Sequence, residues 1–389
     1  MKKFFMKAIF VSIVITMIFS NCIVVAAAEN QAFDVNAKAA ILMDASTGTI
    51  LYEKNIHEAL PPASVTKIMT MLLTMEAIAE NKITLQDKVV VSERASSMGG
   101  TQLYLEPGEM KTVEDLIKGM AIRSANDACV AIGEHLAGSE EGFVEQMNAR
   151  AKELGMENTH FVNTNGLPAE GHVTSAYDIA LMSRELLKHK EIHKWLTTWM
   201  DTVDVGIKNA STQELVNTNR LIRTYKGANG IKTGSTSEAK YCLSASATRG
   251  NTTFIAVILT APTSPIRFSE AAKLLDYGFA NYSTTKVIEK GGSLGSVLVE
   301  KGKVPQANVV ANDDLSVLTK KGEESKIKKE IIIPQSIKAP IMQGQKIGEV
   351  VVTLEGKEIG KIDIVSEETI ESASIIDILG RMFQRMLGH

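Results

Sequence analysis

Residues 61–80 read PPASVTKIMTMLLTMEAIAE, which is a pair of prolines followed by a long apolar segment. Between Val65 and Ile78, apolar side chains would face nearly every side of a helix with about 3.6 residues per turn. A surface helix has one polar face, whereas a helix that is apolar all round is buried. The stretch therefore predicts a helix from Ser64 to Glu80 at the centre of a globular domain.

The segments on either side of this helix contain both strand and helix patterns. Residues 40–44 and 49–52 flank a turn and predict a β-hairpin. Because helix patterns then fill the middle of the region and strand patterns return at its end, without alternation, the predicted fold class is α+β. The later elements are helices at 112–122, 127–137, 140–154 and 175–189, the last with a capping box at Ser175 and Asp178, and strands at 240–247 and 253–259.

Beyond Tyr282 the composition changes, because Phe383 is the only aromatic residue left and short β-branched segments bounded by Gly or Pro become common. Such segments are typical of strands. Gly356 and Lys357 separate two of them, and we predict a two-residue hairpin turn at this pair. We expect a small all-β domain over residues 283–368.

The N-terminus has the features of an export signal. Three lysines precede an apolar run that ends in alanines at 26–28, and a basic start, an apolar stretch and a small-residue cleavage site define a secretory signal peptide. We expect residues 1–28 to be removed; the alternative is a retained anchor helix. Losing three lysines and no acidic residue takes the formal net charge from −3 to −6. The first domain would then span residues 29–282, outside the cytoplasm.

The C-terminal segment, residues 369–389, predicts an amphipathic helix. It is too short to cross a bilayer, which takes ~20 apolar residues, so we expect it to lie on the outer face of the cytoplasmic membrane. The alternative is a helix docked on its own protein. The apolar positions that share one helix face are Ile375, Ile376, Leu379, Met382, Phe383, Met386 and Leu387.

Composition excludes several classes of protein. With 44% hydrophobic and 22% charged residues, the chain is neither a polytopic membrane protein nor disordered. No Lys/Arg block is long enough to follow a phosphate backbone, so nucleic acid is not an expected partner. Cys22 leaves with the signal peptide, and Cys129 and Cys242 have small, apolar neighbours typical of buried free thiols. The histidines lack metal-binding spacing, so we expect no metal and no cofactor.

Ser64 and Lys67 lie one helical turn apart, so their side chains could touch. The first turn offers free backbone N–H groups that favour an oxyanion, and a lysine buried by the apolar helix would have a lowered pKa suited to taking a serine proton. A second S-x-x-K string, Ser237 to Lys240, lies beside a strand pattern and has neither feature. Taken alone, Ser64 could also be a simple helix N-cap.

Lys232-Thr233-Gly234 presents a cation, a hydroxyl and a bare backbone next to a strand pattern. Lys supplies charge, Thr a hydrogen bond, and Gly leaves room beside the strand, a combination that suits a substrate carboxylate. The alternative is a solvated lysine before a turn.

Three short strings follow the export signal in a fixed order: Ser64-Val65-Thr66-Lys67, Ser124-Ala125-Asn126 and Lys232-Thr233-Gly234. This ordered set resembles the penicillin-binding protein and serine β-lactamase superfamily, and within it the low-molecular-mass D-alanyl-D-alanine carboxypeptidases. The resemblance implies an antiparallel sheet with a helical cluster, followed by an all-β domain and an amphipathic helix.

The resemblance also implies residue roles. Ser64 would be the acylated nucleophile, Lys67 its general base and Ser124 a proton relay, while backbone N–H groups of Ser64 and Ser235 would form the oxyanion hole. The implied reaction removes the terminal D-alanine from peptidoglycan stem pentapeptides ending in D-Ala-D-Ala, and β-lactams would acylate the same serine. The implied substrate-binding residues are Asn126, Lys232, Thr233, Gly234 and Ser235.

Three rival functions remain open. A β-lactamase would need a deacylating group, and no E-x-x-L-N string occurs between Asn126 and Lys232. A DD-transpeptidase would use the same acyl-enzyme, and a non-enzymatic wall scaffold would use the all-β domain alone. Ser235 and Lys240 depart from the residues expected after the third string; these departures bear on substrate preference and remove no group needed for the chemistry.

Overall fold

The computed structural model describes residues 33–208, 210–377 and 379. The chain divides into two units, Met1–Asp34 and Val35–His389, and nearly all described residues belong to the second. The predicted signal peptide and most of the predicted terminal helix lie outside the described residues.

A five-stranded antiparallel sheet forms the scaffold of the first part of the second unit, with the strand order β2-β1-β9-β8-β7. The hairpin predicted around residues 45–48 is confirmed, and β7 is an edge strand. The strands are β1 (Ala39–Asp44), β2 (Ile50–Lys54), β7 (Ala228–Thr236), β8 (Lys240–Arg249) and β9 (Thr252–Ala261).

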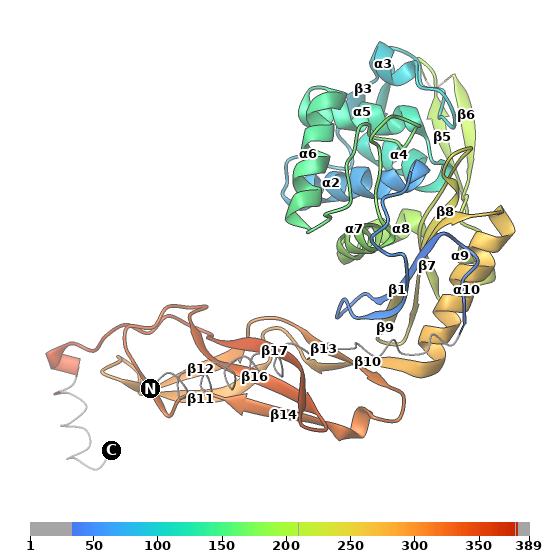
Figure 1. Cartoon of the computed structure of the whole chain (residues 1–389). Helices are drawn as coiled ribbons and strands as arrows, with labels where there is room; N and C mark the ends of the chain where they lie inside the picture. The colour runs from blue at the N-terminus through green and yellow to red at the C-terminus, as the bar shows by residue number, and fades with distance from the viewer. Residues whose placement is uncertain (1–32, 209, 378, 380–389) are drawn as a thin grey trace, which may run out of the picture. The chain divides into compact units, whose positions relative to one another are not determined.

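Helices cover both faces of this sheet. Figure 1 shows α7 and α10 on opposite sides of it, and every residue of β1 is buried, as expected for a strand covered on both faces. The α+β fold is thus confirmed. The longer helices are α2 (Lys67–Ala79), α5 (Asn126–Ala137), α6 (Glu140–Glu153), α7 (Ala176–Lys188) and α10 (Ser264–Asn281).

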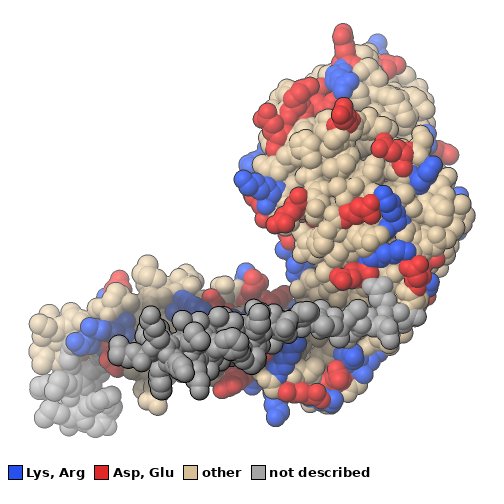
Figure 2. Space-filling view, in the orientation of Figure 1, with Lys and Arg blue, Asp and Glu red and all other residues tan. Residues whose placement is uncertain are grey.

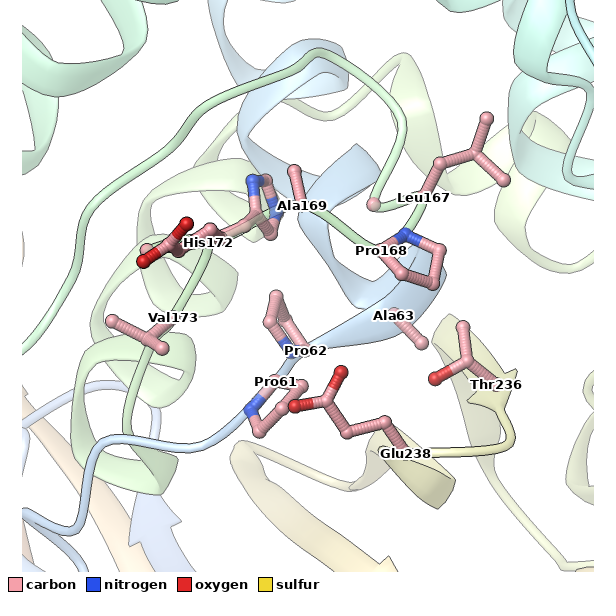
Figure 3. Close-up of a pocket in the computed structure, with 13 residues that line it drawn as sticks. Pro61, Pro62, Ala63, Leu167, Pro168, Ala169, His172, Val173, Thr236 and Glu238 are labelled. Atoms are coloured by element: carbon pink, nitrogen blue, oxygen red, sulfur yellow. The ribbon is translucent and has the colours of Figure 1, made fainter.

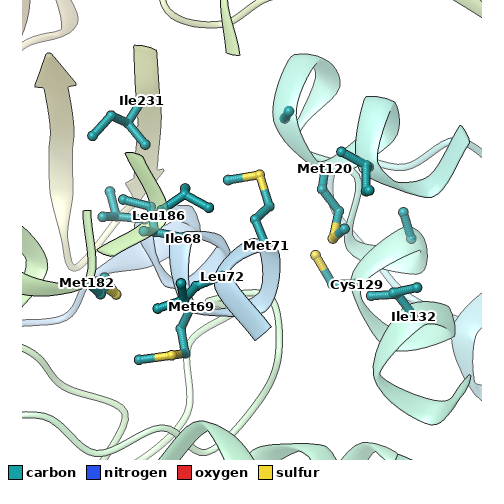
Figure 4. Packing of buried hydrophobic residues seen from close by; sticks show 14 of the residues in the cluster. Ile68, Met69, Met71, Leu72, Met120, Cys129, Ile132, Met182, Leu186 and Ile231 are labelled. Carbon is teal, nitrogen blue, oxygen red and sulfur yellow. The ribbon is translucent and has the colours of Figure 1, made fainter. Parts of the chain in front are cut away.

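The predicted central helix is present but starts later than expected. Residues Ala63–Thr66 form a 3-10 turn, η1, and the α-helix α2 begins at Lys67. Ile68, Met69 and Leu72 pack toward α7, and Met71 faces Met120 and Cys129 (Figure 4). The helix is therefore the centre of the core, while the expectation that Ser64 lies in the α-helix is wrong because the chain enters through a tighter turn.

Two predicted helices differ in detail from the sequence pattern. Residues 112–122 form the short helix α4 (Val113–Lys118) followed by a π-turn, η2 (Gly119–Arg123). At the start of α7, the Ser175 hydroxyl accepts the Asp178 N–H, but the Asp178 carboxylate bonds the loop at Asn158 instead of closing the predicted box.

Several short elements had no sequence prediction. They are β3 (Lys88–Val90), α3 (Glu93–Ser96), β4 (Met110–Thr112), α8 (Ile192–Leu196), β5 (Met200–Val205), β6 (Ser211–Val216) and α9 (Leu221–Thr224).

Between α10 and Ser366 the described residues form strands, with one 3-10 turn, η3 (Glu324–Lys326). Its six-stranded sheet has the order β14-β16-β17-β12-β11-β15, and β10 pairs with β13. An aliphatic core lies inside, including Val309, Val350 and Ile364. The strands are β10 (Tyr282–Ile288), β11 (Ser293–Glu300), β12 (Gln306–Ala311), β13 (Leu315–Lys320), β14 (Ile327–Ile332), β15 (Ser336–Lys338), β16 (Lys346–Leu354) and β17 (Lys357–Ser366).

Two boundary predictions in this region are corrected. The β16–β17 turn consists of Glu355 and Gly356, one residue earlier than predicted, because both have the positive φ that such turns require. The terminal helical residues begin at Ile375 rather than 369, since Ile370 is buried and bridges to Ile341.

Acidic and basic side chains are interspersed on the face shown in Figure 2.

Candidate active site

Ser64 lies in the 3-10 turn η1 with its side chain partly exposed. Strand β7 passes directly behind this turn at Gly234, where an added Cβ would lie 2.9 Å from both the Pro62 carbonyl oxygen and the Ser64 nitrogen. Gly234 is therefore needed so that the strand and the turn can touch. From the sequence, the space beside Gly234 was predicted to hold the substrate, but the turn η1 occupies it.

Lys67 is fully buried one turn after Ser64. Its ammonium donates to Ser64 Oγ at 3.1 Å, Asn126 Oδ1 at 2.7 Å and the Asn165 carbonyl at 2.6 Å. These three acceptors match the three protons of an ammonium and fix its position. Burial lowers the pKa of Lys67, because the charged form loses its hydration. The predicted contact between Ser64 and Lys67 is present.

Asn126 begins α5 and is held from three directions. Its Oδ1 accepts from Lys67, its Nδ2 donates to the Gly99 carbonyl at 2.7 Å, and its backbone N–H donates to Thr101 at 2.8 Å. With both ends of the amide engaged, the orientation that presents oxygen to Lys67 is fixed.

Ser124 lies two residues before Asn126, in a left-handed backbone conformation with φ 71° and a buried side chain. Among the hydrogen bonds of the described residues, none joins its hydroxyl to Ser64 or Lys67. The structure brings Ser124 into the segment that holds Lys67 but gives it no direct bond to the pair.

The carboxylate of Asp127 anchors the loop that carries Gly99 and Thr101. It accepts the N–H groups of Leu103 at 3.0 Å and Leu105 at 3.2 Å, and burial raises its pKa. The sequence analysis did not identify this role, because nothing in the sequence pairs Asp127 with a loop some twenty residues earlier.

The loop at residues 163–167 supplies the third acceptor of Lys67, the Asn165 carbonyl. The Asn163 side chain accepts the Gly166 N–H at 2.7 Å, and Gly166 has φ +87°. A Cβ at Gly166 would lie 1.9 Å from the Ala63 carbonyl oxygen. Only glycine lets this loop approach η1 so closely. A backbone acceptor has no side-chain signature, so the sequence could indicate only the turn.

His172 is buried behind η1, where its ring connects the turn to a second loop. Its Nδ1 accepts the Val162 N–H at 2.9 Å, so the ring is neutral and Nε2–H donates to Thr66 Oγ1 at 2.8 Å. The Thr66 hydroxyl in turn donates to the Ala63 carbonyl at 2.9 Å. Burial, followed by the nearby His160 and Lys67, lowers the pKa of His172 to about 4.

Lys232 and Thr233 lie on β7 beside the Ser64–Lys67 pair. Lys232 is buried, its ammonium donates to the Thr233 carbonyl at 3.2 Å, and burial followed by repulsion from Lys67 lowers its pKa well below the ordinary value. Thr233 Oγ1 lies 2.6 Å from Thr218 Oγ1. Ser235, the predicted substrate-binding residue that follows Gly234 on β7, is exposed.

Arg267 on α10 is a further charged group behind β7 that the sequence analysis missed. Its guanidinium donates to the Gly234 carbonyl at 2.9 Å and to the Cys242 carbonyl at 3.3 Å. Burial lowers its pKa to about 10. This side chain fixes the strand segment that lies against Ser64.

Both cysteines of the described region are free and buried, as predicted. Burial raises the pKa of Cys129 to about 12 and that of Cys242 to about 11, so neither thiol ionises at neutral pH. Within the described residues, no group of three or more His, Cys, Asp or Glu side chains is placed to hold a metal ion.

Comparison with known proteins gives matches over most of the chain. A family described as D-alanyl-D-alanine carboxypeptidase matches residues 25–263, and one described as penicillin-binding protein 5, C-terminal domain, matches residues 282–372. The chain is 46% identical to D-alanyl-D-alanine carboxypeptidase DacF of Bacillus subtilis over 89% of this chain and 88% of the relative. It is 35% identical to D-alanyl-D-alanine carboxypeptidase DacC of Escherichia coli over 88% and 86%. Penicillin-binding protein 5 from Haemophilus influenzae matches in structure with a TM-score of 0.74 at 31% identity, covering 87% of this chain and 99% of that one.

Proposed function

Because the chain belongs to the D-alanyl-D-alanine carboxypeptidase family and is a serine-type peptidase of that class, we propose that Ser64 carries the acyl group and that Lys67 is its general base. The observation that carries this assignment is the 3.1 Å contact between Lys67 Nζ and the partly exposed Ser64 hydroxyl. A base must lie within hydrogen-bond reach of the proton it takes, and this lysine is held there by two further acceptors.

The two buried lysines explain how Lys67 can act as a base. Burial lowers the pKa of both lysines, and repulsion from Lys67 lowers that of Lys232 further. A substrate carboxylate bound at Lys232 and Thr233 stabilises the Lys232 ammonium. Repulsion between the two cations then favours neutral Lys67, which is the form that accepts the Ser64 proton.

The reaction proceeds through an ester on Ser64. The Ser64 oxygen attacks the carbonyl of the penultimate D-alanine, with backbone N–H groups of Ser64 and Ser235 stabilising the oxyanion. The peptide bond breaks and D-alanine leaves as an amine that takes a proton through Lys67 and Ser124. Water then cleaves the ester, which restores the serine hydroxyl and releases the shortened peptide as a carboxylate.

The substrate is a peptidoglycan stem peptide ending in D-Ala-D-Ala, and β-lactams acylate the same serine. Asn126 has one amide proton beyond its bond to Gly99, which is available to a substrate carbonyl. Gly234 acts indirectly by letting β7 approach the nucleophile.

The test is product analysis with a D-Ala-D-Ala pentapeptide and purified protein. We expect free D-alanine as the main product and no release by Ser64→Ala. Cross-linked peptide dimers as the main product would favour a transpeptidase. Rapid turnover of penicillin would favour a β-lactamase, and failure to react with either compound would favour a non-enzymatic wall scaffold.

We also propose that the chain is exported after loss of residues 1–28, and that residues 29–282 form the catalytic domain and residues 283–368 the all-β domain. The C-terminal helix would then rest on the outer face of the cytoplasmic membrane. In the part of the chain that the structure describes, no helix is long and apolar enough to cross a membrane. The Ser374 hydroxyl and the Asp377 carboxylate cap the helix start, and Ile375 and Ile376 are 78% and 81% exposed. A chain ending at Ala373 should keep its activity and lose sedimentation with anionic vesicles; equal sedimentation would reject the anchor.

A further inference from the structure

A cavity of about 420 Å³ adjoins the nucleophile. It lies between the approach to η1, the loop at residues 166–173 and the end of β7, and Figure 3 shows Ala63 and Thr236 on its wall. Ala63, which immediately precedes Ser64, lines this space, so the cavity lies next to the turn that carries the proposed nucleophile.

The cavity wall combines apolar surface with negative charge. Pro61, Pro62 and Pro168 form much of its apolar lining, and Glu170 and Glu238 are its carboxylates. Figure 3 shows the Glu238 side chain extending from the end of β7 toward the two adjacent prolines.

Among the described residues, no cationic side chain lines the cavity beside these two carboxylates. The lining residues include no lysine or arginine, and His172 is neutral because its Nδ1 accepts the Val162 N–H. Among the described residues, neither Glu170 nor Glu238 takes part in an ion pair or a hydrogen bond. The site therefore suits an aliphatic chain that ends in a cation.

The position of the cavity along β7 identifies which part of a substrate would reach it. In the proposed function the substrate carboxylate binds at Thr233 and the scissile carbonyl faces the Ser64 and Ser235 N–H groups. β7 is the free edge of the sheet, so an extended peptide can run beside it with a rise of about 3.3 Å per residue. The residue before D-Ala-D-Ala then falls beside Thr236 and Glu238.

We propose that this cavity binds the amine-bearing side chain of the diamino acid that precedes D-Ala-D-Ala in the stem peptide, with Glu238 and Glu170 pairing with its ammonium. The assignment rests on the proposed function, since it uses the carboxylate and acyl positions given there. Both carboxylates are solvent-exposed, so each pairing is modest, and we expect a preference of about three- to tenfold for a free ammonium.

The test compares two peptides of equal side-chain length, Nα-acetyl-L-lysyl-D-Ala-D-Ala and Nα-acetyl-L-norleucyl-D-Ala-D-Ala, by the kcat/KM of D-alanine release. Wild-type protein should prefer the lysyl peptide. Glu238→Gln should lower kcat/KM for that peptide alone, and the double variant with Glu170→Gln should remove the preference. Glu145→Gln is the matched control, because Glu145 is exposed on α6 and does not line the cavity.

The outcomes separate this assignment from the proposed function. Release of D-alanine from both peptides at equal rates, or a preference that survives in the double variant, rejects the cavity as the ammonium site while leaving the proposed function intact. No release from either peptide by wild-type protein rejects the proposed function and this assignment with it. Interactions between exposed charges are largely screened at an ionic strength of about 0.5 M. Loss of the preference for the lysyl peptide at this salt concentration would therefore support the pairing.

Discussion

The catalytic region and the strand region after α10 bury different kinds of side chain. Around Ser64 the buried groups include Lys67, Lys232 and Asp127, whereas the buried polar residues described after α10 are uncharged, namely Thr284, Thr319 and Ser366. Burying a charge costs free energy unless it is well bonded. The first region therefore holds buried charges at a cost in stability, whereas the buried polar groups described in the second carry no charge and avoid that cost.

The largest expected effect is on Lys67. Lys67→Met should lower the rate of acylation by penicillin by about 10²- to 10⁴-fold, because the general base is lost. The free energy of unfolding should change by less than about 3 kcal/mol, because two effects oppose each other. Removing the buried ammonium is stabilising, whereas leaving its acceptors without a donor is destabilising. Acylation kinetics and denaturant unfolding measure the two effects.

Lys361→Met is the control for this change, because Lys361 is exposed on β17. It should leave both quantities unchanged. Acylation by Lys67→Met within tenfold of wild type would show that the catalytic region does not depend on its buried charge.

The next effect concerns Gly166. Gly166→Ala places a Cβ 1.9 Å from the Ala63 carbonyl and requires φ +87° of alanine, so the loop that presents the Asn165 carbonyl to Lys67 must move. We expect at least a tenfold slower acylation and a loss of more than about 1 kcal/mol of stability. Gly155→Ala has similar strain at φ +74° with no atom within 4 Å, so it should lose stability alone. Equal acylation by both variants would contradict the role of the loop.

The third prediction is a pH dependence from His172. Its pKa of about 4 in the folded protein lies below the ordinary 6.5, so the unfolded chain takes up a proton that the folded protein resists. Stability from this group is present above pH 6.5 and is lost as pH falls toward 4, by at most about 3 kcal/mol. Raised carboxyl pKa values, such as that of Asp127, act in the opposite direction, so a difference measurement is needed.

That difference is the unfolding free energy of wild type minus that of His172→Gln, followed from pH 7 to pH 4. It should shrink as pH falls. The same subtraction with His135→Gln, an exposed residue on α5, should stay flat. A difference for His172 that is constant with pH would mean that the ring is not held neutral behind η1.

The smallest expected effect on acylation comes from the strand region. Ile364→Ala removes a fully buried side chain and should destabilise that region by about 2–5 kcal/mol. Acylation at a temperature where the variant stays folded should change less than twofold. Ile331→Ala, on the exposed part of β14, should be nearly neutral in both assays. Parallel losses of stability and acylation in Ile364→Ala would remove the distinction between the two regions.

Several elements with long or local patterns could be predicted from the sequence, but α10, the longest helix among the described residues, was not. The apolar run of α2 and the β1–β2 hairpin have clear periodicity, and the S-x-x-K spacing placed Lys67 next to Ser64. Short strands such as β3 and β4 have too few residues to show a period, so they were not predicted.

The missed parts of the site depend on contacts between distant segments. Asn165 contributes a backbone oxygen, which any residue could supply, and Arg267 reaches Gly234 from a helix that follows two later strands. Gly234 was predicted to leave room for a ligand. Only the folded chain shows that the turn carrying Ser64 packs against this glycine. Such contacts follow from the topology rather than from local sequence.

The role of Ser64 as the acylated residue is tested most directly by the mass of the penicilloyl protein. Reaction with penicillin, digestion and peptide mapping should place a single adduct on the peptide containing Ser64, and Ser64→Ala should gain no mass. An adduct on the peptide containing Ser124 or Ser237, or one that persists in Ser64→Ala, would contradict the assignment.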